Sequence, residues 1–145
     1  MDYVDNGIVN LAIKDKLFHS DKLEVRKSSI LGYGVFAKED IKRGELLEEC
    51  HYCELEEYID DDNFYRYIYA FFDGELPNGQ KREHHCIVFG YAPLYNSSNE
   101  FEGVNVRWKF KKHISYKLFV LSAIKDIKKD EELLQGYLGE LDIEE

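Results

Sequence analysis

Short apolar segments separated by glycine-containing turns make up most of this chain of 145 residues. Residues 23–26 alternate apolar and polar side chains, which is typical of a half-buried strand, and a glycine-rich turn and a second strand through Val35 and Phe36 follow. Further strands are expected at residues 46–52, 104–110 and 116–123. Many short strands separated by turns predict a mainly β fold with a few short helices.

Two segments in the middle of the chain are less regular. The segment 63–72 is dense in aromatic side chains and fits either a short buried helix or a strand, of which we favour the helix. The segment 74–82 contains Pro77-Asn78-Gly79 and is predicted to be a loop, because these residue types commonly form turns.

The chain has the usual length of one domain, and its 44% of hydrophobic residues is enough for an ordinary core. No repeat or linker divides it. No run of about 18 apolar residues is present, and acidic residues stand near the N-terminus where a secretory signal carries lysines. We therefore expect an intracellular, single-domain protein without a membrane segment, located in the cytoplasm or with nuclear chromatin.

The formal net charge of -10 argues against direct binding to nucleic acid, which depends on clustered lysine and arginine. It favours a basic protein or peptide as partner. Acidic residues gather at 54–62 and at 139–145. Each of these stretches is interpreted first as solvated surface, and second as a region that attracts a cationic substrate.

Gly32 and Gly34 flank Tyr33, and glycine lets a backbone turn tightly and approach a ligand closely. Considered alone, this pattern favours a plain β-turn over a ligand-binding turn, because short motifs often match by chance. A dinucleotide-binding turn is disfavoured, because no third glycine follows and residues 35–37 continue as a strand instead of opening a helix.

Three segments match one pattern when they are taken in chain order. They are residues 32–45 with Gly32-Tyr33-Gly34, residues 89–105 with Asn96-Ser97-Ser98 and Asn105, and residues 123–137 with Asp130-Glu131-Glu132-Leu133 and Tyr137. Together they resemble the opening turn, the asparagine-histidine-serine motif and the closing acidic turn and tyrosine of the SET-domain family of protein-lysine methyltransferases.

The resemblance covers residues 23–139 and leaves residues 1–22 as an N-terminal extension and residues 140–145 as an acidic C-terminal tail. It implies a SET domain of the β-clip type, built of short curved sheets with a C-terminal pseudoknot. That strand crossing would bring Asn96 and Tyr137 together.

The resemblance also implies a function, which is methylation of a lysine side chain on a basic protein, such as a histone-like tail, with S-adenosylmethionine. Gly32, Tyr33 and Gly34 would contact this cofactor through their backbone, and the Asn96 amide would lie against it. Ser97 replaces the family's histidine, and extra residues are inserted within 99–103. These departures affect cofactor affinity.

Tyr137 is the catalytic residue that the resemblance implies. Methyl transfer from a sulfonium needs a neutral, aligned amine in a dry channel more than it needs a strong acid or base. The Tyr137 hydroxyl would orient the lysine amine, and the sulfonium charge and the loss of water would both lower the lysine pKa.

The family's lysine channel is lined by aromatic rings, whose faces attract an ammonium group. The candidates are Tyr67, Tyr69, Tyr91 and Tyr95, with Tyr91 as first choice. Other aromatic residues of the chain are interpreted as core. Since residues 138–145 hold no cysteine-rich cap and no aromatic residue, the lid would come from elsewhere in the chain, from a second subunit of a homodimer or from the substrate.

Two alternatives compete with a methyltransferase. The first is a SET-like domain that binds a basic peptide with little or no catalysis. The second is a zinc-stabilised interaction domain, with Cys50 and Cys53 as a half-site and His84-His85-Cys86 as the remaining ligands. We expect no metal, because side chains alternate between faces along the predicted strand 46–52 and the second cluster lacks matching spacing. An odd number of cysteines, three, also fits no disulfide framework.

Overall fold

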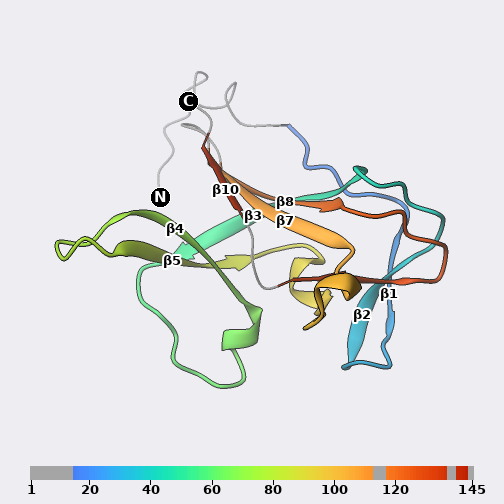
Figure 1. The fold of residues 1–145 in the computed structure, drawn as a ribbon, viewed down its shortest axis with the longest axis horizontal. Helices are drawn as coiled ribbons and strands as arrows, with labels where there is room; N and C mark the ends of the chain where they lie inside the picture. Colours follow the sequence, from blue (N-terminus) through green and yellow to red (C-terminus); the bar gives the residue numbers. More distant parts are fainter. Residues whose placement is uncertain (1–14, 113–116, 137–139, 144–145) are drawn as a thin grey trace.

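The computed structural model describes residues 15–112, 117–136 and 140–143, and it consists mainly of β-strands (Figure 1). The strands are β1 (Leu23–Lys27), β2 (Tyr33–Ala37), β3 (Leu46–Leu55), β4 (Ile68–Glu75), β5 (Lys81–Val88), β6 (Asn96–Ser97), β7 (Val106–Lys112), β8 (Lys117–Ala123), β9 (Glu132–Gln135) and β10 (Glu140–Ile143). Three single 3-10 turns are η1 (Tyr65–Tyr67), η2 (Ala92–Leu94) and η3 (Phe101–Gly103). The mainly β prediction is confirmed. None of the described helices has the length and apolar character needed to cross a membrane.

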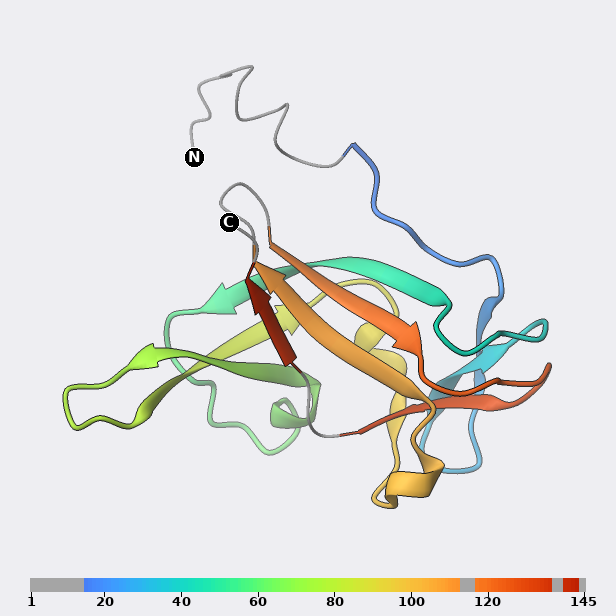
Figure 2. The same ribbon diagram turned by 45° about the horizontal axis from the view of Figure 1, so that its top comes forward.

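The strands follow the order β1-β2-β9-β7-β8-β3-β5-β4, which is not their order in the chain. The β4–β5 hairpin projects on one side and the β1–β2 hairpin lies on the other (Figures 1 and 2). β9 lies between β2 and β7, and it pairs in parallel with β6 so that Asn96 stands opposite Leu134. This is a crossing of the kind that the sequence predicted for the C-terminal part of the domain.

The core is formed mainly by side chains of β3, β4, β7 and β8. Phe110 and Phe119 stand opposite each other on β7 and β8, have no exposed surface, and hold their ring centroids 5.1 Å apart. Trp108 stacks on Phe119 at 5.4 Å, and Tyr69 packs edge-on against the same ring at 4.7 Å. Clusters of large rings bury much apolar surface, so these contacts stabilise the wall that the functional site shares.

The predicted helix at residues 63–72 is wrong. Only η1 is helical there, and β4 begins at Ile68. Along β4 Tyr69 and Phe71 are buried, whereas Phe72 is 56% exposed. Packing of alternate rings against the core favours a strand, whose side chains alternate between faces. The predicted loop 74–82 is shorter in the structure, because β4 continues to Glu75 and β5 starts at Lys81.

The segments on either side of the expected domain also join the fold. The backbone N–H of Ser20 donates to Leu47 O at 2.8 Å, and that of Glu49 donates to Phe18 O at 2.8 Å, so part of the N-terminal extension runs beside β3. Residues 140–143, expected in the acidic tail, form β10 and pair in parallel with β7. Residues 1–14 and 144–145 lie outside the described residues.

Candidate active site

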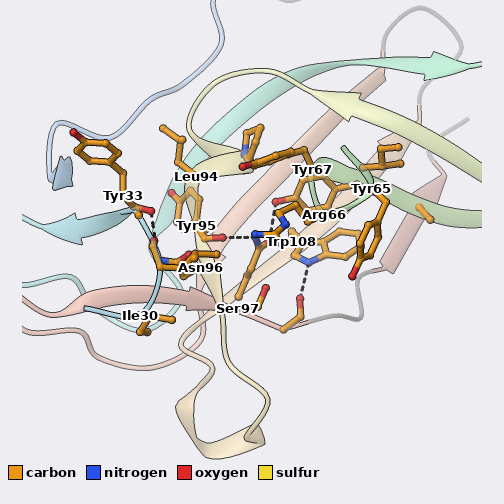
Figure 3. A pocket seen from close by; sticks show the side chains of 18 residues that line it. Ile30, Tyr33, Tyr65, Arg66, Tyr67, Leu94, Tyr95, Asn96, Ser97 and Trp108 are labelled. Atoms are coloured by element: carbon orange, nitrogen blue, oxygen red, sulfur yellow. Dashed lines mark hydrogen bonds between the residues drawn. The ribbon is translucent and has the colours of Figure 1, made fainter. Parts of the chain in front are cut away.

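A cavity of about 820 Å³ opens between four stretches of chain that are far apart in sequence (Figure 3). They are the turn 30–33, η1 with the start of β4, residues 93–97, and the end of β9 with Gly136. Trp108 completes the wall. The volume lies in the usual range for small-molecule sites, roughly 300–1,000 Å³.

Most of the site residues predicted from sequence meet at this cavity. Those that line it are Gly32, Tyr33, Tyr67, Tyr69, Tyr95, Asn96 and Ser97. Gly34 lies close behind the lining, next to Asn96. Tyr91 does not line the cavity. Tyr137 lies outside the described residues, although Gly136, which precedes it, is part of the wall.

The turn before β2 has the geometry that the glycines predicted. Gly32 has a φ of 51°, in the left-handed region where a side chain is strained, and its carbonyl accepts a hydrogen bond of 2.7 Å from the N–H of Ser28. The next residue, Tyr33, is 67% exposed. The turn therefore places backbone and an aromatic ring at the edge of the cavity.

Asn96 joins this turn to β9. Its Nδ2 donates to Glu132 Oε2 at 2.8 Å and faces the carbonyl oxygens of Leu31 at 3.2 Å and Tyr33 at 3.4 Å. The hydroxyl of Ser28 donates to Glu132 Oε1 at 2.8 Å. The Glu132 carboxylate is thus the common acceptor that holds two cavity segments together.

Gly34 is required at its position by the same contacts. A Cβ there would overlap Glu132 Oε2 and approach Asn96 Nδ2 to 3.0 Å. Because Glu132 is tied by hydrogen bonds on both sides, it cannot move aside without breaking one of them. Gly34 therefore acts by allowing the Asn96–Glu132 contact.

Asn105 fixes the position of β9. Its Nδ2 donates to Glu132 O at 3.0 Å, and its Oδ1 accepts from the N–H of Leu134 at 2.7 Å. The Asn105 side chain, which is 7% exposed, thus bonds to the backbone of β9 in the way that a neighbouring strand would. The sequence marked Asn105 as part of a motif but assigned it no role.

The inner wall is a chain of polar contacts between aromatic residues and Gln135. The Tyr69 hydroxyl lies 2.7 Å from Ala92 O and 2.9 Å from Gln135 Oε1, and Gln135 Nε2 donates to Tyr95 O at 2.8 Å. Burial raises the pKa of Tyr69 above its ordinary value, so its hydroxyl stays neutral at physiological pH. Tyr69 is a fixed wall residue.

Trp108 also contacts the backbone that leads to Tyr137. Its Nε1–H donates to Gly136 O at 3.2 Å, and the indole is 5% exposed. Because the ring stacks in the core, this bond sets the orientation of the Gly136 carbonyl at the cavity. The sequence gives no signal for this role, since Trp108 alternates inward on β7 like its apolar neighbours.

Behind the cavity lies a buried carboxylate, Glu48, which is 1% exposed. It accepts hydrogen bonds from the Tyr95 hydroxyl at 2.8 Å and from the N–H of Tyr91 at 3.1 Å. His19 Nδ1 lies 3.3 Å from Glu48 Oε1, and the His19 ring packs edge-on against Tyr91 at 4.6 Å. The ring of Tyr91, the first choice for the channel, therefore packs against the N-terminal segment, and its channel role stays a prediction.

The position of Glu48 carries a signal that the sequence analysis missed. Along β3 the inward side chains include Cys50 and Tyr52, which follow Glu48 at strand spacing. A carboxylate that shares a buried strand face with such residues must find donors, because an unpaired charge is costly in the interior.

The geometry gives no support to the zinc alternative. Cys50 is buried and Cys53 is exposed, as expected for residues on opposite faces of β3. Within the part of the chain that the structure describes, no three His, Cys, Asp or Glu side chains are grouped to hold a metal ion. Burial raises the pKa of Cys50 well above its ordinary value and that of Cys86 to about 12.

These cysteine environments predict selective labelling. Only Cys53 should react with iodoacetamide in the native protein at pH 8, because the thiolate is the reactive form and the other two thiols are buried and protonated. Mass spectrometry should find one label per native chain and three per chain unfolded in urea. Rapid native labelling of Cys50 or Cys86 would contradict the buried positions.

Comparison with known proteins supports the interpretation of the site. The sequence model of the SET-domain family matches residues 32–138 of this chain. No curated protein matches the chain significantly. A solved structure of a candidate histone methyltransferase from Plasmodium falciparum is 26% identical, with a TM-score of 0.62, and the match covers 82% of this chain and 95% of that one.

Two further structures share the fold at lower identity. The Neurospora SET-domain protein DIM-5, a histone lysine methyltransferase, is 21% identical with a TM-score of 0.57, and the match covers 80% of this chain and 52% of that one. ATXR5, solved in complex with histone H3.1, is 17% identical with a TM-score of 0.59, and the corresponding shares are 83% and 56%. The chain thus spans little more than half of these two proteins. The predicted SET fold is confirmed.

Proposed function

Because the chain belongs to the SET-domain family, we propose that it methylates a lysine side chain on a protein with S-adenosylmethionine as methyl donor. The main support for this proposal is one observation about the cavity. A single cavity joins the Gly32 turn, the Asn96-Ser97 pair and the backbone that leads to Tyr137, which are the three elements that the family uses.

The residues of the cavity fit S-adenosylmethionine. This molecule has an adenine ring, a sulfonium and an amino-acid end, and the wall offers aromatic faces, the Ser97 hydroxyl and the Asn96 amide. Asn96 Oδ1 remains as an acceptor beside the three contacts that its Nδ2 makes. Rings of tyrosine and tryptophan attract cationic groups such as a sulfonium or ammonium.

When bound, S-adenosylmethionine supplies an electrophilic methyl group. An incoming lysine would first give one ammonium proton to solvent. Its neutral nitrogen would then take up this methyl group, and the sulfonium would become a neutral thioether as the carbon–sulfur bond breaks. The chain must therefore align a neutral amine and exclude water, and we assign the alignment to the Tyr137 hydroxyl.

The buried contacts around the cavity suit this task. Tyr69, Tyr95 and Gln135 bond to one another and to backbone, so the inner wall has a fixed shape. A fixed wall of aromatic rings lowers the local polarity, which favours the neutral form of an inserted lysine. The wall thus acts on the amine through desolvation.

We also propose a basic protein as substrate, with a histone tail as first candidate. The net charge of -10 attracts a lysine-rich segment, and similar structures belong to histone methyltransferases, one of them in complex with histone H3.1. The location in the cell and a homodimer stay predictions.

Binding of S-adenosylmethionine is the direct test. Calorimetric titration of the folded protein should give one site per chain, and Asn96→Ala should weaken binding by about tenfold because one oriented amide is lost. Asn78→Ala, in the β4–β5 hairpin, is the matched control and should leave the affinity unchanged. No heat at millimolar ligand would rule out the methyltransferase and leave the peptide-binding alternative.

A further inference from the structure

Arg66 is the one charged side chain among the described residues that line the cavity. It lies on η1 between two exposed tyrosines, Tyr65 and Tyr67, and Figure 3 shows these three residues beside Trp108. The rest of the lining is aromatic, aliphatic or neutral polar. A single cation in such a wall makes the cavity selective for the charge of what it binds.

Some cations of the fold are paired, but Arg66 forms no ion pair or hydrogen bond with any residue that the structure describes. The guanidinium of Arg26 lies 2.7 Å from Glu24 and 2.9 Å from Asp130, and Lys112 lies 3.2 Å from Asp73. Arg66 is exposed at the cavity. Its side chain is therefore accessible to a ligand in the cavity.

The backbone of η1 is held by local hydrogen bonds. The N–H groups of Phe64 and Tyr65 donate to Asp61 O at 3.0 Å, and the Asp61 carboxylate accepts from the N–H of Asn63 at 2.8 Å. The N–H of Tyr67 donates to Phe64 O at 3.0 Å. Only the Arg66 side chain has to become ordered on binding, which keeps the entropic cost of using it small.

Electrostatics then decide which ligand group Arg66 suits. The chain carries a net charge of -10, so an anionic group enters the cavity against the field of the whole protein unless a local cation compensates. A guanidinium presents a planar set of donors that matches a carboxylate with two parallel hydrogen bonds. A lysine ammonium, in contrast, would be repelled by Arg66.

We propose that Arg66 binds the α-carboxylate of S-adenosylmethionine and so places the amino-acid end of the cofactor at η1. This inference rests on the proposed function, because it takes the cofactor as the occupant of the cavity. It adds a cofactor-binding residue from a segment where the sequence indicated only aromatic channel residues. It also directs the target lysine to the part of the cavity away from η1.

The test compares two ligands that differ in one group, S-adenosylmethionine and its decarboxylated form. Calorimetry should show that Arg66→Met weakens S-adenosylmethionine binding by roughly ten- to hundredfold, which is the usual worth of a charge-assisted contact. The affinity for the decarboxylated ligand should change less than about twofold. Arg66→Lys should give an intermediate loss, since it keeps the charge but loses the paired donors.

Arg82→Met is the matched control, because it removes the same charge from an exposed position on β5 outside the cavity lining. It should leave both affinities unchanged. Equal losses for both ligands in Arg66→Met, or no loss for either, would overturn the inference while leaving the proposed function standing. A folded wild-type protein that binds neither ligand would overturn the proposed function and this inference with it.

Discussion

Tyr137→Phe should lower methyl transfer by about a hundredfold or more while leaving the fold and the affinity for S-adenosylmethionine close to wild type. The substitution removes one hydroxyl and keeps the ring, so only the orientation of the lysine amine is lost. Loss of a single oriented group at a reacting centre commonly costs this much. Transfer of labelled methyl onto lysine-rich proteins, including histones and the chain itself, measures the effect.

Tyr58→Phe is the control for this experiment, since Tyr58 is 51% exposed and packs edge-on against His85 at 4.9 Å. Its rate should equal that of wild type. Wild-type activity that Tyr137→Phe leaves intact would remove Tyr137 from the catalytic role and return attention to the tyrosines of the cavity wall.

Glu48→Ala should destabilise the protein by about 3 kcal/mol. It removes the acceptor of the Tyr95 hydroxyl and of the Tyr91 N–H, and each buried donor left without a partner costs about 1–3 kcal/mol. Loss of the His19 contact and the small cavity left behind act in the same direction. Urea unfolding followed by tryptophan fluorescence, with Trp108 as the probe, gives the free energy of unfolding.

Two further variants test whether the loss of stability in Glu48→Ala comes from the buried hydrogen bonds of Glu48. Glu56→Ala removes an exposed carboxylate and should change the free energy of unfolding by less than about 0.5 kcal/mol. Tyr95→Phe removes one of the donors and should cost less than Glu48→Ala. A stability loss in Glu48→Ala no larger than that in Glu56→Ala would show that the buried carboxylate is not what holds Tyr95 and Tyr91.

The sequence predicted the strands well, because their signal is local. Alternation at residues 23–26 and the apolar run of residues 118–121 both lie in strands of the structure. The aromatic segment 63–72 is so dense in rings that it fits a helix or a strand, and no local pattern shows which of the rings the core will bury. Contacts with Phe119 and Phe110 on other strands decide that, through Tyr69 and Phe71.

The same distinction applies to the cavity. Gly32, Asn96 and Ser97 were predicted from motifs, and the structure brings them to one wall. Arg66 and Glu48 were missed, because their roles depend on what the folded chain places opposite them. The surroundings of Tyr91 were not predicted either. Its ring contacts His19, which belongs to an N-terminal segment that no motif links to Tyr91.

The place of β9 in the sheet has a consequence for how the cell makes this protein. β9 lies between β2 and β7, yet the ribosome synthesises it after both of them. Until residue 135 has emerged, β2 and β7 lack this partner, and unpaired strand edges invite association with other chains. Pairings between distant segments also form slowly. Because Gln135 and Gly136 belong to the cavity wall, the cavity is completed only after β9 has been synthesised, and assistance from a chaperone would matter most in the interval before β9 inserts.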